Sequence, residues 1–279
     1  MSDGSPIDLI NYDKASQRFE LNPKAVETIL EVGGNTGLIF NIGEPKIGKS
    51  YLLNRVMDLK RGFQENSRGM KLWSKPFYRE DENLFLFFID AQGFDSDSNF
   101  ANFVWSLSFL TGTIVLYNSK GNITEKTFDA LKPLEHVAAA LKISPDSVEN
   151  SYMMSYYAPK LIWVLKDHRA IEDVNGKPMQ PDKYLETSLL EQSSNAHSVA
   201  VKKFITNIVR ERCCVAFGNF QGDNDLMAYN TSVLKEKIYS RSFIKYFDGV
   251  PFSARMIVNF MVGFIELFNA KKDIEYYDM

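Results

Sequence analysis

The residues with the clearest chemical potential form a phosphate-binding motif. Residues 43–50 read Gly-Glu-Pro-Lys-Ile-Gly-Lys-Ser, a complete G-x-x-x-x-G-K-S/T pattern that follows a β-rich run and opens a helical stretch. The glycines let successive backbone N–H groups turn toward a phosphate, and the start of the helix adds partial positive charge. We expect Lys49 to reach the β- and γ-phosphates and the Ser50 hydroxyl to ligate Mg²⁺. A glycine turn with an exposed lysine is the alternative, which the flanking strand and helix disfavour.

A second acidic group stands at the end of another apolar run. Residues 84–89 are continuously apolar and lead into Asp90-Ala-Gln-Gly93. Asp90 is expected to hold a magnesium-bound water, and the Gly93 N–H to meet the γ-phosphate with no side chain in the way. An aspartate that caps the next turn is the alternative. Together the two motifs favour a phosphate-driven switch over a passive nucleotide site.

Lys166-Asp167 is the candidate for recognising the base of the nucleotide, and it follows the apolar run 161–165. A carboxylate there accepts two hydrogen bonds from the guanine N1–H and exocyclic amine, which adenine does not offer. The Asn-Lys-x-Asp signature of small GTPases is absent, because no Asn-Lys pair occurs in the chain. A surface ion pair is the ordinary interpretation of Lys-Asp, and both interpretations stay open on these residues alone.

The elements that must position these groups alternate along the chain. Continuous apolar runs predict buried parallel strands at 37–42, 84–89, 113–117, 160–165 and 213–217. Helices are predicted between and after them, at 50–59, 99–109, 124–142, 198–211, 232–246 and 255–269. This alternation predicts an α/β fold, a P-loop NTPase sandwich with a mostly parallel central sheet and helices on both faces.

Two regions lie outside that alternation. Residues 1–36 carry an amphipathic piece around 23–32. The segment after Asp167 contains a turn signal at Asn175-Gly176 and two prolines, and it reads as an insertion with a short helix capped by Asp182.

Length and charge limit the remaining possibilities. The 279 residues are enough for one large domain, and we expect a single domain over 1–279 without a helical stalk. A formal charge of −3 with no block of like charge argues against nucleic acid as a partner. Cys213 and Cys214 are neighbours in an apolar run, so we expect buried thiols, and with no signal peptide at the N-terminus we expect a cytoplasmic protein.

Residues 98–119 contain no charged side chain and are long enough to cross a bilayer. Serines and threonines interrupt the run, and its pattern changes from helix-like to β-branched at 113–117. A buried helix that enters a buried strand is therefore predicted, and no membrane span.

Five motifs in order resemble the guanylate-binding protein and atlastin branch of the dynamin-like large GTPases. Residues 43–54 are similar to that family's P-loop, 69–74 to its strand after switch I, 90–93 to its switch II, 117–123 to its Tyr-Asn-Ser strand end and 165–167 to its guanine motif. The insertion at 175–186 is similar as well, and the resemblance runs from about residue 7 to 270. It implies a domain that binds GTP or GDP with Mg²⁺, hydrolyses GTP, and forms a nucleotide-dependent homodimer through the face carrying residues 43–70 and 90–100.

Three positions depart from the family pattern. Lys46 stands where the family has an arginine that stabilises the transition state in cis, and a lysine lacks the planar fork, so slow hydrolysis is expected. Ser67 is the candidate for the family's magnesium-binding threonine of switch I, with an ordinary loop serine as the alternative. Gln92 replaces an acidic residue of switch II and is expected to orient the attacking water without acting as a base.

The resulting set of catalytic candidates is Lys46, Lys49, Ser67 and Gln92, and the metal candidates are Ser50, Ser67 and Asp90. The nucleotide-binding candidates are Gly43, Glu44, Pro45, Lys46, Ile47, Gly48, Lys49, Ser50, Tyr51, Asp90, Gly93, Lys166, Asp167 and, in the guanine-cap region, Gly218. Three rival functions remain: a catalytically weak GTP-binding switch or interaction module, a P-loop ATPase or kinase, and a structural domain with a relic P-loop.

Overall fold

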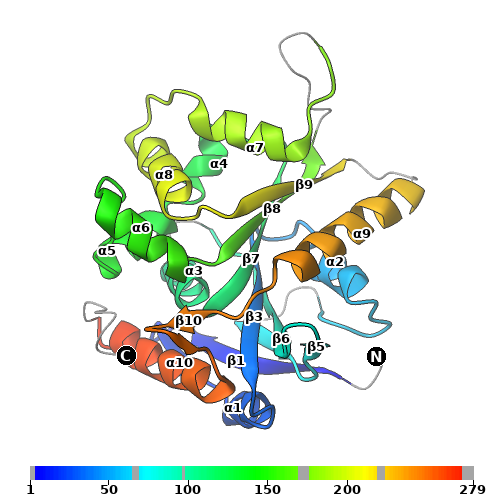
Figure 1. Cartoon of the computed structure of the whole chain (residues 1–279), viewed down its shortest axis with the longest axis vertical. Helices are drawn as coiled ribbons and strands as arrows, with labels where there is room; N and C mark the ends of the chain where they lie inside the picture. Colours follow the sequence, from blue (N-terminus) through cyan, green and yellow to red (C-terminus); the bar gives the residue numbers. More distant parts are fainter. Residues whose placement is uncertain (1–3, 65–68, 96–97, 169–175, 219–223, 272–279) are drawn as a thin grey trace.

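A nine-stranded sheet forms the centre of the molecule in the computed structural model, which describes residues 4–64, 69–95, 98–168, 176–218 and 224–271 (Figure 1). The strand order is β2-β1-β4-β6-β3-β7-β8-β9, and β5 pairs with β6. The strands are β1 (Pro6–Asp13), β2 (Arg18–Leu21), β3 (Asn35–Gly43), β4 (Met70–Trp73), β5 (Phe77–Arg79), β6 (Leu84–Ala91), β7 (Gly112–Lys120), β8 (Lys160–His168) and β9 (Arg212–Gly218); β10 (Tyr246–Phe247) and β11 (Val250–Pro251) form a separate hairpin.

The five predicted strands are confirmed as one parallel block. Strands β6, β3, β7, β8 and β9 pair in parallel, whereas β1, β2, β4 and β5 join the sheet in antiparallel pairs. The antiparallel additions at residues 6–21 were not predicted, because β1 and β2 are partly exposed and lack the continuous apolar character of buried strands.

Helices cover both faces of the sheet, as predicted. They are α1 (Pro23–Leu30), α2 (Lys49–Val56), α3 (Asn99–Thr111), α4 (Glu125–Asp129), α5 (Pro133–Ala140), α6 (Val148–Tyr157), α7 (Pro181–Leu190), α8 (Ala196–Asn207), α9 (Asn224–Arg241) and α10 (Ala254–Asn269). Within β3 the side chains of Leu38, Phe40 and Ile42 belong to one buried cluster, while Ile39 belongs to the other. Helices α2 and α9 pack over the second cluster, and the larger first cluster includes α1, α3, α8 and α10.

Several helix predictions were wrong in detail, and the helix expected over 198–211, for example, ends at Asn207. The helix expected over 124–142 is two helices, because Pro133 has no N–H for a continuing helix and instead begins α5. The helix expected to end at residue 246 ends at Arg241, and Tyr246 lies in β10. Asp182 is not the N-cap of α7: Gln180 holds that position, and Asp182 accepts hydrogen bonds from Cys214 N and Lys237 Nζ.

The uncharged run at 98–119 is a buried helix followed directly by a buried strand. Helix α3 ends at Thr111 and β7 begins at Gly112, where a Cβ atom would lie 2.3 Å from the Ser108 carbonyl oxygen. The buried Lys245 Nζ donates to the carbonyl oxygens of Phe109, Leu110 and Gly112 at 2.7–3.2 Å, so it closes the end of α3. Among the described residues, no helix combines the length and apolarity that crossing a membrane requires.

Both cysteines are buried and unbridged, as predicted, and burial raises the pKa of each thiol.

Candidate functional site

The phosphate-binding motif lies in the strand–loop–helix context that its mechanism requires. Strand β3 ends at Gly43, and α2 begins at Lys49 with Gly48 as its N-cap in the left-handed region (φ 72°). At Gly43 (φ 130°), a Cβ atom would lie 2.1 Å from the Asn118 carbonyl oxygen, so only glycine fits. The loop therefore begins and ends at positions where a side chain is excluded or strained.

Lys49 lies inside the loop that it serves. It is 6% exposed, and its Nζ donates to the Glu44 carbonyl oxygen at 2.7 Å. Burial lowers the pKa of Lys49, while the charges of Asp90 and Glu44 oppose this shift. An ammonium group held by a loop carbonyl in this way can exchange that carbonyl for a phosphate oxygen.

Ser50 and Asp90 join the two motifs. The Ser50 hydroxyl donates to Asp90 Oδ2 at 2.6 Å, and Asn41 Nδ2 donates to Asp90 Oδ1 at 2.7 Å. Asp90 is fully buried; burial raises the pKa of its carboxyl, and the two hydrogen bonds oppose that rise. The parallel register that pairs Asn41 with Asp90 brings these groups to one edge of the sheet.

This donor set fits Mg²⁺. A hydroxyl and a carboxylate are hard oxygen ligands, and Mg²⁺ is usually held by one or two carboxylates together with substrate phosphates. The described residues contain no cluster of three or more His, Cys, Asp or Glu side chains that would form an all-protein cage. Ser50 and Asp90 are thus suited to a metal that arrives with a phosphate ligand.

The switch II segment lies directly against the loop. A Cβ atom on Gly93 would be 2.2 Å from Pro45 Cα, and Phe94 N donates to the Gly43 carbonyl oxygen at 3.4 Å. Gln92 is bound to the start of β4, because Gly69 N donates to Gln92 Oε1 at 2.8 Å. The amide oxygen predicted to orient water is therefore engaged by the backbone. Ser67, the switch I candidate, lies outside the described residues.

The base-recognition candidates reach the same edge. Lys166 Nζ donates to the Gly48 carbonyl oxygen at 2.7 Å, which links the end of β8 to the loop. Asp167 (φ 51°) is half exposed, and its carboxylate lies 3.5 Å from Lys120 Nζ. Gly218 ends β9 beside β8, while residues 219–223 of the guanine-cap region lie outside the described residues.

The other loop candidates face outward. Lys46 is exposed and in the left-handed region (φ 57°), and Pro45 is exposed beside it. Ile47 is half-buried, and Tyr51 on the first turn of α2 is 49% exposed and accepts a hydrogen bond from Arg55.

Sequence reasoning missed two buried amides at this site. Asn41 lies within β3 and Asn118 within β7, and their side chains form a chain of hydrogen bonds that ends at Asp90. The available signal was an asparagine inside each of two otherwise apolar strands. The Tyr-Asn-Ser motif contains Asn118, but motif spacing assigns it no role.

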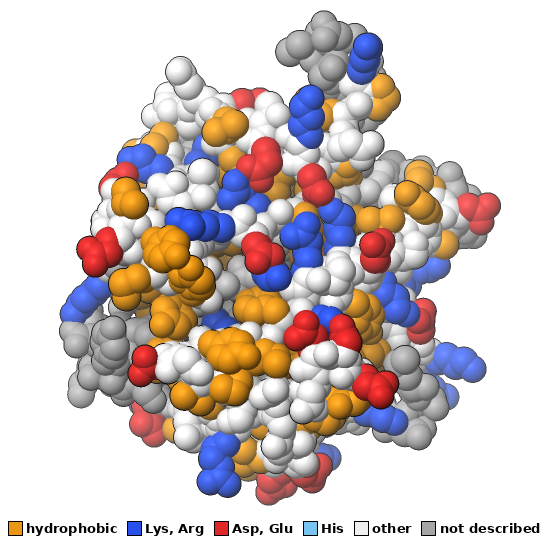
Figure 2. Space-filling model, viewed as in Figure 1, with side chains coloured by type: hydrophobic (Ala, Val, Ile, Leu, Met, Phe, Trp, Pro, Cys, Tyr) orange, Lys and Arg blue, Asp and Glu red, His pale blue; other side chains and the backbone are white. Residues whose placement is uncertain are grey.

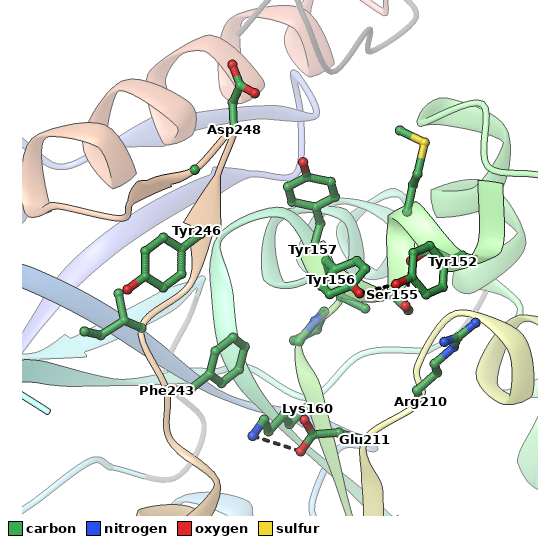
Figure 3. A pocket seen from close by; sticks show the side chains of 15 residues that line it. Tyr152, Ser155, Tyr156, Tyr157, Lys160, Arg210, Glu211, Phe243, Tyr246 and Asp248 are labelled. Atoms are coloured by element: carbon green, nitrogen blue, oxygen red, sulfur yellow. Dashed lines mark hydrogen bonds and ion pairs between the residues drawn. The ribbon is translucent and has the colours of Figure 1, made fainter. Parts of the chain in front are cut away.

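A separate groove of about 710 Å³ lies between α6 and the β10–β11 hairpin (Figure 3). The aromatic side chains of Tyr152, Tyr156 and Tyr246 are half exposed along it, and Lys160 pairs with Glu211 at 2.8 Å on its floor. Figure 2 shows hydrophobic side chains gathered on this face, over α6 and the hairpin. The groove is lined by the start of β8 and the residue before β9, whereas the phosphate loop follows the end of β3. Because these strands are parallel, the groove and the loop lie at opposite ends of the strands.

Comparison with known proteins points to one family. Residues 16–249 match the family described as "Guanylate-binding protein, N-terminal domain". Among curated proteins, the chain is 26% identical over 234 residues to human guanylate-binding protein 2, which covers 76% of this chain and 38% of that protein. It is 25% identical over 263 residues to human guanylate-binding protein 4, covering 88% and 40%. The chain thus spans less than half the length of these relatives.

Proposed function

The chain belongs to the guanylate-binding protein family, and on that premise we propose that it binds GTP with Mg²⁺ at the phosphate loop and hydrolyses it slowly to GDP and phosphate. We further propose that residues 1–279 act as one GTPase domain.

The observation that carries the proposal is the Ser50–Asp90 hydrogen bond of 2.6 Å. This bond joins the last residue of the loop motif to the acidic end of β6. A hydroxyl and a carboxylate in these two positions are the protein groups that a nucleotide-bound Mg²⁺ needs. Lys49 lies buried beside them, so a cation is already held next to the expected position of the β- and γ-phosphates.

Each group has a defined task in this proposal. The backbone N–H groups of residues 46–49 bind the phosphates, and Lys49 balances their charge. Ser50 and Asp90 hold the metal, which when bound neutralises charge on the transferred phosphoryl group. Asp167 accepts hydrogen bonds from guanine, and Lys46 faces outward at the position where the family's arginine stabilises the transition state.

Self-association through the face of residues 43–70 and 90–100 is part of the proposal. The exposed Lys46 and half-exposed Tyr51 lie on that face, so a second copy placed against it would contact the nucleotide edge. Size measured by light scattering should therefore increase with a non-hydrolysable GTP analogue and return to the smaller species with GDP.

A second candidate function is a GTP-binding switch with little hydrolysis. The hydrogen bond from Gly69 N to Gln92 Oε1 favours it, because this bond occupies the oxygen that would orient the attacking water. This candidate binds GTP and self-associates without phosphate release.

Isothermal titration with GDP, GMP, a non-hydrolysable GTP analogue and ATP tests the proposal, with and without Mg²⁺. We expect guanine nucleotides to bind and ATP to bind at least about tenfold more weakly, since adenine cannot satisfy Asp167. Asp167→Asn should reduce that preference, and Lys49→Ala should reduce binding of every nucleotide. The exposed Lys24→Ala on α1 is the matched control. Equal affinity for ATP and GTP would refute guanine recognition, and phosphate release from GTP separates the two candidate functions.

A further inference from the structure

Asp90 is oriented by two hydrogen-bonded buried amides, to which the sequence motifs assign no role. Asn41 Nδ2 donates to Asp90 Oδ1 at 2.7 Å, and Asn118 Nδ2 donates to Asn41 Oδ1 at 2.8 Å. All three side chains are at most 2% exposed. The three residues come from adjacent strands, since β3 lies between β6 and β7.

The orientation of the two amide groups is determined by the contacts of Asn118. Asn118 Nδ2 also approaches the carbonyl oxygens of Ile42 and Leu116 at 3.1 and 3.2 Å. Carbonyl oxygens only accept, so the NH₂ end of Asn118 must face them and Asn41 Oδ1. With its oxygen bound to Asn118, Asn41 can present only its NH₂ group to Asp90. The carbonyl oxygens of β3 and β7 thereby orient both amides so that Asp90 Oδ1 accepts from the Asn41 NH₂ group.

The cost of this arrangement points to a role beyond packing. Asn118 Oδ1 is buried with no hydrogen-bond partner among the described residues. An unpaired buried acceptor is unfavourable, and apolar side chains at 41 and 118 would avoid it. The arrangement leaves Asp90 Oδ2 directed at Ser50, where the metal is expected.

We propose that Asn41 and Asn118 are positioning residues for Mg²⁺, which orient Asp90 so that Oδ2 serves Ser50 and the metal while Oδ1 is occupied by Asn41. This inference rests on the proposed function, because it concerns the metal of the same site. Neither asparagine contacts the nucleotide or the metal; each acts through Asp90.

The experiment measures the Mg²⁺ dependence of nucleotide binding on the full chain. GDP carrying a fluorescent N-methylanthraniloyl group is titrated first in EDTA and then at increasing Mg²⁺ concentration. In Asn41→Leu and Asn118→Leu, we expect the affinity in EDTA to equal that of the unaltered protein, because the loop N–H groups and Lys49 are unchanged. The Mg²⁺ concentration for half-maximal effect should rise by about tenfold or more, as when the partner of a metal ligand is removed.

Thr113→Val is the matched control, because Thr113 lies on the same strand as Asn118 and its buried hydroxyl also lacks a hydrogen-bond partner among the described residues. It should leave the Mg²⁺ dependence unchanged. If a leucine variant does not fold, Asn41→Ala, which only removes atoms, takes its place with the same expected rise.

The outcomes separate the two proposals. A Mg²⁺ requirement that is unchanged in the Asn41 variants, or an affinity that falls equally in EDTA and in Mg²⁺, overturns the positioning role and leaves the proposed function intact. If the unaltered protein binds the labelled GDP with no Mg²⁺ dependence or does not bind it, the proposed metal site and the positioning role fall together.

Discussion

Gln92 and Gly69 are joined by two hydrogen bonds, one from Gln92 N to the Gly69 carbonyl oxygen at 2.9 Å and one from Gly69 N to Gln92 Oε1 at 2.8 Å. The pair ties the switch II segment to the start of β4. The side chain that sequence reasoning assigns to the attacking water is thus also a structural tie.

Gln92→Glu should accelerate hydrolysis, because a carboxylate still accepts from Gly69 N and adds a base near the γ-phosphate. Gln92→Ala removes the acceptor for Gly69 N and the group expected to orient the attacking water. It should therefore slow single-turnover phosphate release by about tenfold or more. GDP affinity is the control and should change little in either variant. An alanine variant that hydrolyses GTP at the original rate would show that Gln92 has no part in hydrolysis.

Lys46→Arg should raise the single-turnover rate by about tenfold, a small part of what an arginine contributes in other GTPases. The planar guanidinium can bridge two phosphate oxygens, whereas the ammonium of Lys46 binds as a point charge. Lys46→Met, measured in parallel, should be slower than the original protein. Equal rates for all three side chains would place this residue outside the reaction.

Gly93→Ala should weaken GTP binding by about tenfold or more, because its Cβ would meet the backbone of Pro45 at 2.2 Å and must displace the loop. Gly34→Ala serves as the control, since the nearest atom to a Cβ there belongs to the Phe85 side chain, at 3.1 Å, and not to the backbone. Titration calorimetry with thermal unfolding of both variants distinguishes a displaced loop from general destabilisation. Unaltered GTP affinity in Gly93→Ala would contradict the close packing of the two segments.

Lys245→Met should lower the free energy of unfolding by about 2–4 kcal/mol, because three buried carbonyl oxygens at the end of α3 lose their donor. Burial lowers the pKa of Lys245 to about 7, from 10.5. Between pH 7 and 10 the unfolded chain then binds more protons at this residue than the folded one, so its contribution to stability rises with pH and is lost as pH falls toward 7. The difference in unfolding free energy between the two proteins, measured by denaturant titration, should therefore grow from pH 7 to pH 9.5. A constant difference would mean that Lys245 does not titrate in this range.

The parallel half of the sheet could be predicted because its strands are buried on both faces and so are continuously apolar. In an α/β fold, runs such as 84–89 and 160–165 are buried only as interior strands of the sheet. Strands β1 and β2 could not be predicted in the same way, since their partial exposure permits mixed residues. After α9 ends at Arg241, the chain brings Lys245 to the end of α3, a contact between residues far apart in sequence that no local pattern reveals.

The loop motif and Asp90 were predictable because phosphate and metal chemistry require specific residues at specific spacing. The roles of Asn41 and Asn118 were not, because they arise from the register of three strands and not from any local pattern. The tie between Gln92 and Gly69 likewise depends on how β4 meets the end of β6.

The place of β3 in the sheet has a consequence for synthesis. Gly43 pairs with Asn118 of β7, and Glu44 N donates to the Asn118 carbonyl oxygen at 3.2 Å. A growing chain that has not yet reached Asn118 therefore has its complete phosphate motif but lacks the strand pairing and the hydrogen bond that β7 gives to the start of the loop. The motif is thus translated early, whereas its contacts with β7 form only after a further strand has emerged and paired.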